Sequence, residues 1–277
     1  MTKQPTAGTA AERQFLEEMG HALTGWSDPA ARLRDALNSN ALALFVQPML
    51  TLANGQFERA EVLVRMREEE ETLLPPGEFL PVFEHFRMMP ELDRWVVART
   101  VAHLRRGSRI GRFSINVSGQ TLADPGFPGF VADTLRSARV APAALAFEID
   151  ETDALRQPDV AEGFAATMKA AGCGLLIDGF GRRSVSFLPL KTLQIGCVKV
   201  DGSIVRKILS SESALAKLKA VVRVGEVIGV EVLAECVEEQ DVLVRLKALG
   251  VGFAQGFGIA QPFAIEKLDA SGGPRRP

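Results

Sequence analysis

The sequence has few cysteines, no excess of basic residues and no long apolar run, and each absence excludes a class of protein. Its three cysteines, Cys173, Cys197 and Cys236, are too few and too far apart for a disulfide framework or a zinc-ligand pattern. We therefore expect all three to be reduced and buried, in a cytoplasmic protein. The formal net charge of −2 and the isoelectric point near 6.0 give no indication of a nucleic-acid-binding surface.

The apolar runs are too short to cross a bilayer, and the polar residues 1–14 lack the apolar core of a signal peptide. We therefore expect no membrane span and no nucleic-acid partner. The sequence also lacks a P-loop and a complete Gly-x-Gly-x-x-Gly motif after a strand, which excludes two common nucleotide sites. With 277 residues, of which 47% are hydrophobic, the chain has enough apolar material for one large domain.

Strand-like and helix-like segments alternate through most of the sequence. Eight strands are predicted, at residues 42–49, 58–66, 113–118, 145–150, 174–178, 197–201, 230–236 and 252–255. Helix-length segments separate most of these strands, which predicts a mostly parallel sheet with right-handed crossovers. Eight strands in about 240 residues favour an α/β fold of the TIM type, a closed (β/α)8 barrel.

The first two strands depart from this alternation. Asn54-Gly55 lies between them and is a strong hairpin signal, so they are predicted to be antiparallel neighbours. The division of the chain follows from these elements. Residues 1–28 form an N-terminal extension with a short amphipathic helix at 10–24, residues 29–268 form the barrel, and residues 269–277 form a loose tail.

Polar residues recur near the ends of the strands. They are Glu61, Arg65, Asn116, Glu148, Asp178, Lys199, Asp201, Glu235, Glu238 and Gln255. Carboxylates together with an amide oxygen are typical ligands of Mg²⁺, Mn²⁺ or Ca²⁺, and neighbouring cations suit an anionic ligand such as phosphate. Taken alone, each of these residues is better interpreted as an interior residue of the barrel that is paired with another polar group. Taken together at the strand ends, the set is better interpreted as a functional site.

Nine short motifs follow one another along the sequence: Phe45-Val46-Gln47-Pro48, Glu61-Val62-Leu63-Val64-Arg65, Leu92-Asp93-Arg94-Trp95-Val96, Asn116-Val117-Ser118, Glu148-Ile149-Asp150-Glu151, Asp178-Gly179-Phe180-Gly181, Lys199-Val200-Asp201, Ala234-Glu235-Cys236-Val237-Glu238 and Gln255-Gly256-Phe257. In this order, and over residues 32–263, the sequence resembles the EAL domains of cyclic di-GMP signalling. The resemblance implies a modified (β/α)8 barrel whose first strand is antiparallel, in agreement with the predicted hairpin.

Active members of that family are phosphodiesterases that linearise cyclic di-GMP to pGpG with two Mg²⁺ or Mn²⁺ ions. The resemblance implies one metal site made by Glu61, Asn116, Glu148 and Asp178. It implies catalytic roles for Lys199, Glu235 and Glu61. It implies ligand-binding or supporting roles for Gln47, Leu63, Arg65, Asp201, Gln255 and Glu238.

Two departures from the family pattern bear on activity. Gly179 stands where the family has a second aspartate, so the second metal ion loses a direct carboxylate and only one ion is expected. The loop that follows, Arg182-Arg183-Ser184-Val185-Ser186, also differs from the family's TGYSS. Two interpretations of Arg182 and Arg183 are open: they are solvated loop charges that pair with local acids, or a guanidinium fills the vacated metal position and neutralises a ligand phosphate.

Three functions are consistent with these features. The favoured one is a degenerate EAL domain that binds cyclic di-GMP with weak or no hydrolysis. The first alternative is an active metal-dependent phosphodiesterase, and the second is a protein-interaction scaffold that does not bind the nucleotide. A homodimer and a regulatory protein partner are further expectations from the resemblance.

Overall fold

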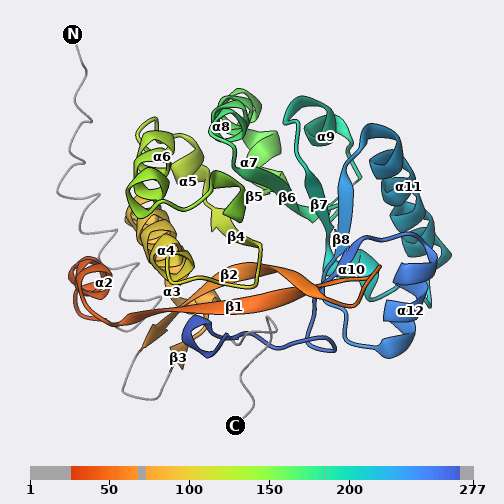
Figure 1. Cartoon of the computed structure of the whole chain (residues 1–277), viewed down its shortest axis with the longest axis horizontal. Helices are drawn as coiled ribbons and strands as arrows, with labels where there is room; N and C mark the ends of the chain where they lie inside the picture. Colours follow the sequence, from red (N-terminus) through yellow and green to blue (C-terminus); the bar gives the residue numbers. More distant parts are fainter. Residues whose placement is uncertain (1–25, 68–72, 184, 269–277) are drawn as a thin grey trace.

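The computed structural model describes residues 26–67, 73–183 and 185–268 (Figure 1). The helix expected at 10–24 and the tail expected at 269–277 lie outside these residues. The helices are α2 (Pro29–Asn38), α3 (Pro76–His85), α4 (Met89–Leu104), α5 (Gly119–Leu122), α6 (Phe127–Ala138), α7 (Glu151–Arg156), α8 (Pro158–Ala170), α9 (Leu188–Thr192), α10 (Gly202–Val205), α11 (Glu212–Ile228) and α12 (Gln240–Ala248). The strands are β1 (Leu42–Thr51), β2 (Phe57–Arg67), β3 (Leu73–Leu74), β4 (Arg112–Val117), β5 (Leu145–Asp150), β6 (Gly174–Phe180), β7 (Cys197–Val200), β8 (Glu231–Ala234), β9 (Phe253–Ala254) and β10 (Phe263–Ala264).

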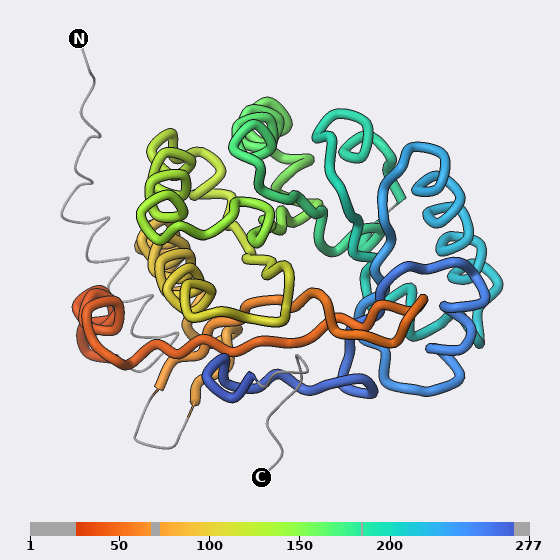
Figure 2. Tube along the Cα trace, in the orientation of Figure 1, coloured from red at the N-terminus to blue at the C-terminus, as the bar shows by residue number. Residues whose placement is uncertain are grey.

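Eight of these strands close into a barrel, in the order β1-β2-β4-β5-β6-β7-β8-β9 and back to β1. Neighbouring strands from β2 to β9 are parallel, whereas β1 is antiparallel to both β2 and β9. Helices α4 to α12 lie around the parallel strands, and β1 and β2 run together across the remaining side (Figures 1 and 2). The predicted fold, a modified (β/α)8 barrel with its first strand antiparallel, is confirmed.

The hairpin between β1 and β2 forms where the sequence predicts it. The strands pair from Leu42 opposite Met66 to Leu50 opposite Phe57. Gly55 adopts a φ of 72°, a left-handed conformation that glycine accommodates without steric cost, and its N–H donates to the Thr51 carbonyl.

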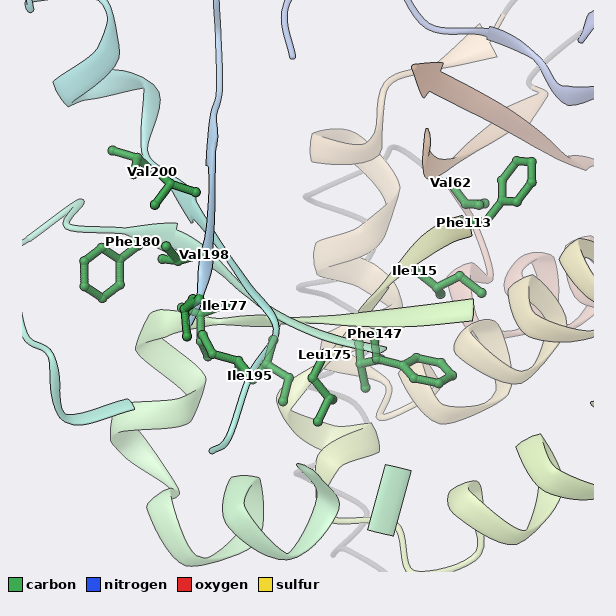
Figure 3. Packing of buried hydrophobic residues seen from close by; sticks show 14 of the residues in the cluster. Val62, Phe113, Ile115, Phe147, Leu175, Ile177, Phe180, Ile195, Val198 and Val200 are labelled. Carbon is green, nitrogen blue, oxygen red and sulfur yellow. The ribbon is translucent and has the colours of Figure 1, made fainter. Parts of the chain in front are cut away.

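Outward-facing residues of the parallel strands form the core between barrel and helices (Figure 3). Phe147 of β5 is fully buried there and meets Phe127 of α6 and Phe164 of α8 edge-on, with ring centroids 6.0 and 6.1 Å apart. Such aromatic contacts add to the burial of apolar surface. The helices are therefore held to the strands by the residues that alternate with the interior ones.

Two stacked layers of side chains fill the barrel interior. The lower layer is apolar and consists of Met49, Ala146, Leu176, Cys197, Leu233 and Phe253. Side chains two apart on a strand point the same way, so residues two positions nearer the rim also face inward. That rule places a polar layer above the apolar one: Gln47, Glu148, Asp178, Lys199, Glu235 and Gln255. On β1 the step runs backwards in sequence, from Met49 to Gln47, because β1 is antiparallel.

Strand β6 contains an irregularity that the sequence pattern does not predict. We expected it to end at Asp178, but it continues to Phe180 with a shift of register against β7 between Ile177 and Phe180. Gly179 lies in this bulge with a φ of 66°. The extra residue lets Asp178 face the interior while Phe180, only two residues later, packs in the outer core against Phe187.

Other differences from the expected elements are small. Strands β8 and β9 are shorter than predicted, and the short helices α5, α7 and α10 follow β4, β5 and β7 directly. The cysteines are free, but Cys236 is half-buried rather than buried, because it lies beyond the end of β8 at the rim. Within the described ranges no helix is both long and apolar enough to cross a membrane.

Candidate functional site

The Lys199 ammonium lies at the centre of the polar layer. Its Nζ is 2.6 Å from a carboxylate oxygen of Glu148, 3.1 Å from Glu61, 3.1 Å from Asp178 and 3.6 Å from Glu235. Its side chain is only 3% exposed. The structure therefore brings together four acids that the sequence places on four different strands or strand ends.

Burial and mutual repulsion shift the protonation of this cluster. Burial, together with the Glu61 carboxylate, raises the pKa of Glu148 to about 8. Burial, with a hydrogen bond to Asp178, raises the pKa of Glu235 well above its usual value. For Asp178, burial acts upward, but the Lys199 ammonium outweighs it and holds the pKa well below its usual range. Burial acts to lower the pKa of Lys199, and the surrounding carboxylates raise it well above its usual value.

Amide side chains complete the polar layer on the β1 side. Gln255 Nε2 donates to Glu61 Oε2 at 2.9 Å and lies 3.3 Å from Gln47 Oε1. Gln47 Nε2 in turn donates to the Ala260 carbonyl, and Asn116 Nδ2 donates to Glu61 Oε1 at 2.7 Å. Glu61 is thus fixed from three sides, by two amides and the ammonium.

The donor set of the cluster fits a hard cation. In this conformation no three His, Cys, Asp or Glu side chains of the described part of the chain are already arranged around a space for a metal ion, because the ammonium takes the central place. Glu148 Oε1 is buried without a hydrogen-bond partner, and Asp178 Oδ1 and Glu235 Oε1 contact the Lys199 ammonium at 3.1 and 3.6 Å. Buried carboxylate oxygens beside an amide are suitable ligands for Mg²⁺ or Mn²⁺.

Two cavities open on either side of Asp178, which lines both. One, of about 260 Å³, has an apolar wall that includes Leu63, Leu80 and Met89 and also reaches Glu148. The other, of about 360 Å³, is lined by Glu61, Asp178, Lys199, Arg206, Glu235, Glu238, Gln255 and Phe257, among others. The acidic cluster therefore lies between an apolar cavity and a polar one.

Of the remaining predicted site residues, Leu63 and Glu238 line these cavities, whereas Arg65 and Asp201 line neither of them. Arg65 follows Leu63 on the same face of β2, and its guanidinium lies over the Phe45 ring at 5.5 Å. Glu238 is exposed and lies 3.9 Å from Arg206, outside the Lys199 cluster. Asp201 has both carboxylate oxygens engaged, one by the N–H of Ser203 and the other by Arg182.

The vacant side of Gly179 is filled by another side chain. A Cβ built on Gly179 would lie 2.5 Å from Nη2 and 2.8 Å from Cζ of Arg182. Arg182 Nε donates to Asp201 Oδ2 at 2.9 Å, and Nη1 donates to Asp150 Oδ2 at 3.0 Å. Arg182 and Arg183 are both exposed, but among the described residues only Arg182 of the two pairs with carboxylates at the rim.

Sequence reasoning missed three residues at the site. Asp150 lies two residues after Glu148, so strand alternation alone could have placed it on the interior face of β5. Arg206 and Phe257 line the polar cavity from α10's end and from the turn after β9, and the ring of Phe257 is 64% exposed. Phe257 is the last residue of the Gln255-Gly256-Phe257 motif, but no role was assigned to it, and none of the motifs contains Arg206. The positions of both residues depend on how loops fold back over the rim.

The chain is similar to known proteins in sequence and in fold. The family model for the EAL domain matches residues 30–262. The chain is 31% identical over 237 residues to the cyclic di-GMP phosphodiesterase PdeB of Shewanella oneidensis, in a match that covers 84% of this chain and 28% of that protein. The chain thus spans less than a third of that relative's length.

Two solved structures match in fold and in sequence. The FimX EAL domain of Pseudomonas aeruginosa, bound to c-di-GMP, has a TM-score of 0.80 and 28% identity, covering 86% of this chain and 97% of that chain. The MucR phosphodiesterase in complex with c-di-GMP has a TM-score of 0.81 and 28% identity, covering 87% of this chain and 99% of that chain. By the match over residues 30–262 and the shared barrel, the chain belongs to the EAL domain family.

Proposed function

We propose that this EAL domain binds cyclic di-GMP and hydrolyses it weakly or not at all. The observation that carries the proposal is at Gly179. This residue has no side chain, and the space beside it is taken by the Arg182 guanidinium. A carboxylate that would hold a second metal ion is therefore absent, and a cation of the protein itself lies next to its place.

The rest of the rim supports ligand binding. The two cavities flank a cluster that carries Lys199, and one cavity is apolar enough to accept a purine base. In the other, the exposed ring of Phe257 offers a face for a second base. Two relatives in the same family are described as binding c-di-GMP, and they match this chain at 28% identity.

One divalent ion has suitable ligands in this site. Glu61, Asn116, Glu148 and Asp178 would hold Mg²⁺ or Mn²⁺, which when bound would neutralise charge on a ligand phosphate and acidify a bound water. The protein's own residues would orient the ligand: Lys199 would direct its ammonium toward the phosphates, and Leu63 and Arg65 would contact the nucleotide. Metal binding would release protons from the acids whose pKa burial raises.

Calorimetry with cyclic di-GMP tests binding, and chromatography of the same mixtures tests turnover. We expect saturable heat with the nucleotide and little pGpG after prolonged incubation with Mn²⁺. Absence of any heat at high micromolar ligand would contradict the proposal in favour of the scaffold. Robust metal-dependent formation of pGpG would contradict it in favour of the phosphodiesterase, for which the retained Lys199 cluster is the supporting observation.

A further inference from the structure

Arg182 is anchored at the rim by two aspartates from different strands. Its Nε donates to Asp201 at 2.9 Å and its Nη1 donates to Asp150 at 3.0 Å. The side chain of Arg182 is 49% exposed, whereas that of Asp201 is 12% exposed. The guanidinium therefore bridges the carboxyl ends of β5 and β7 while half of it faces solvent.

Both aspartates are themselves fixed by helix caps. Asp150 Oδ1 accepts from the N–H of Thr152 at 2.7 Å and caps α7, and Asp201 Oδ1 accepts from the N–H of Ser203 at 2.9 Å and caps α10. Each carboxylate thus uses one oxygen for its helix and the other for Arg182. An anchor of this kind is preorganised, because the caps hold the acids with or without the arginine.

The position of the guanidinium depends on Gly179. Any Cβ at residue 179 would lie 2.5 Å from Nη2, closer than carbon and nitrogen approach without a bond, so the side chain would have to move. The position of the Arg182 guanidinium therefore requires that residue 179, in the bulge, has no side chain.

The free nitrogen of the guanidinium lies beside Gly179, the residue that follows Asp178. Nη2 has no hydrogen-bond acceptor among the residues that the structure describes, although Nε and Nη1 each have one. Asp150, which pairs with Arg182, and Asp178 both line the apolar cavity. Without Arg182, the carboxylates of Asp150 and Asp178 would repel an anion that enters there.

We propose that Arg182 serves as the resident cation of this half of the site, in place of a second divalent ion. It compensates the three aspartates and donates from Nη2 to a phosphate oxygen of the bound cyclic dinucleotide. The inference rests on the proposed function, and its distinctive consequence is that binding persists when divalent ions are removed.

Calorimetric titration of the full chain with cyclic di-GMP in the presence of EDTA tests this inference. We expect the wild type to bind, and Arg182→Met to bind at least about 10-fold more weakly, as for the loss of a hydrogen bond from a charged group. The matched control is Arg183→Met, which removes an exposed neighbouring guanidinium and should change affinity less than about twofold. Arg182→Lys should fall between them, because an ammonium keeps the charge but not the fork of donors.

A second variant displaces the guanidinium without removing it. Gly179→Ala places a Cβ against Nη2 and should weaken binding in EDTA, while the double variant Gly179→Ala/Arg182→Met should be no weaker than Arg182→Met alone. Thermal melts show which variants remain folded, and the affinities of the single and double variants are compared only among those that do.

The outcomes separate the two proposals. If wild type and Arg182→Met bind equally in EDTA, or if wild type binds only when Mg²⁺ or Mn²⁺ is added, the role of Arg182 is overturned and the proposed function stands. If the wild type binds cyclic di-GMP under neither condition, both are overturned.

Discussion

Lys199 has the environment of a bound cation within the protein, since four carboxylates lie within 3.6 Å of its ammonium. A lysine in this position compensates charges that would otherwise repel one another in the barrel interior. Burying the acids is tolerable only while that compensation is present. The stability of the barrel and the chemistry of its rim therefore depend on the same residue.

Lys199→Met should destabilise the protein by about 3–5 kcal/mol near neutral pH, because it leaves buried carboxylates without a counter-charge. The deficit should shrink in mild acid, where those carboxylates bind protons. Urea unfolding at both pH values measures it, with exposed Lys207→Met as the matched control. Added Mn²⁺ should stabilise the variant more than the wild type. A variant as stable as wild type at neutral pH would show that Lys199 does not compensate buried negative charge in the folded state.

Gly179→Asp alone should not restore efficient turnover. The new carboxylate would lie against the Arg182 guanidinium and pair with it, instead of remaining free for a metal ion. The double variant Gly179→Asp/Arg182→Thr removes that competitor and should form more pGpG in the presence of Mn²⁺ than either single variant. Chromatographic assay of pGpG decides this, and full turnover by the Gly179→Asp variant alone would show that Arg182 does not obstruct the position.

Cys236 is a non-glycine residue with a φ of 55° at the rim, directly after Glu235. Left-handed backbone conformations cost side-chain-bearing residues about 1–2 kcal/mol. Cys236→Gly should therefore raise the free energy of unfolding by about 0.5–1 kcal/mol, visible as a higher melting temperature. Cys236→Ala keeps the Cβ and should give no such gain; an equal gain from alanine would assign the effect to the thiol instead of the backbone.

At the scale of elements, helix α4 is tied to the rim through one buried acid. Asp93 Oδ2 accepts hydrogen bonds from the Ser118 N–H, the Ser118 hydroxyl and the Thr121 hydroxyl, so α4 holds the turn from β4 into α5. Asn116 lies two residues before Ser118. The orientation of this site residue is thus set partly by a helix that does not itself line the acidic cluster.

Burial raises the pKa of Asp93 to about 6, against the downward effect of its hydrogen bonds. The folded protein therefore holds the proton more tightly than the unfolded chain, so this group's contribution to stability is full below about pH 4 and is lost as the pH rises through about 6. The loss is on the order of 3 kcal/mol. Urea unfolding across this range should show a smaller decline for Asp93→Asn than for wild type, with exposed Glu78→Gln retaining the wild-type slope. Identical slopes for all three would contradict the assignment.

Strand alternation is the part of the fold and site that the sequence predicts best. Apolar residues two positions before Glu148, Asp178, Lys199 and Glu235 mark the inward face of four strands, and the structure places all four side chains in one layer. The hairpin and the barrel follow from equally local signals. The bulge in β6 does not, because a single glycine within an apolar run is consistent with a strand end or a continuing strand.

The sequence left two interpretations of Arg182 open, and its ion pairs with Asp150 and Asp201 are the local pairing that the first of them describes. To predict these contacts, one would have to know the path of the loop after β6 and the positions of Asp150 and Asp201, which lie at the ends of other strands. Contacts between loops and distant strands depend on tertiary geometry, which residue types alone do not specify. The same reason explains why Arg206 and Phe257 were missed.

At the scale of the whole molecule, the barrel combines a rigid apolar lower half with a charged upper half. The lower layer and the outer core fix the strands, and the upper layer presents Lys199, the acids and Arg182 between two cavities. We propose that this rim binds cyclic di-GMP, with a metal ion in one half of the site and Arg182 in the other. Retention of the nucleotide in unaltered form is therefore the central claim.

Equilibrium dialysis of the full chain against cyclic di-GMP with Mn²⁺, followed by chromatography of the retained nucleotide, tests that claim most directly. The account predicts saturable retention of intact cyclic di-GMP, close to one per chain, with little pGpG on either side of the membrane. Conversion of most of the nucleotide to pGpG, or no retention above the buffer level, would contradict it.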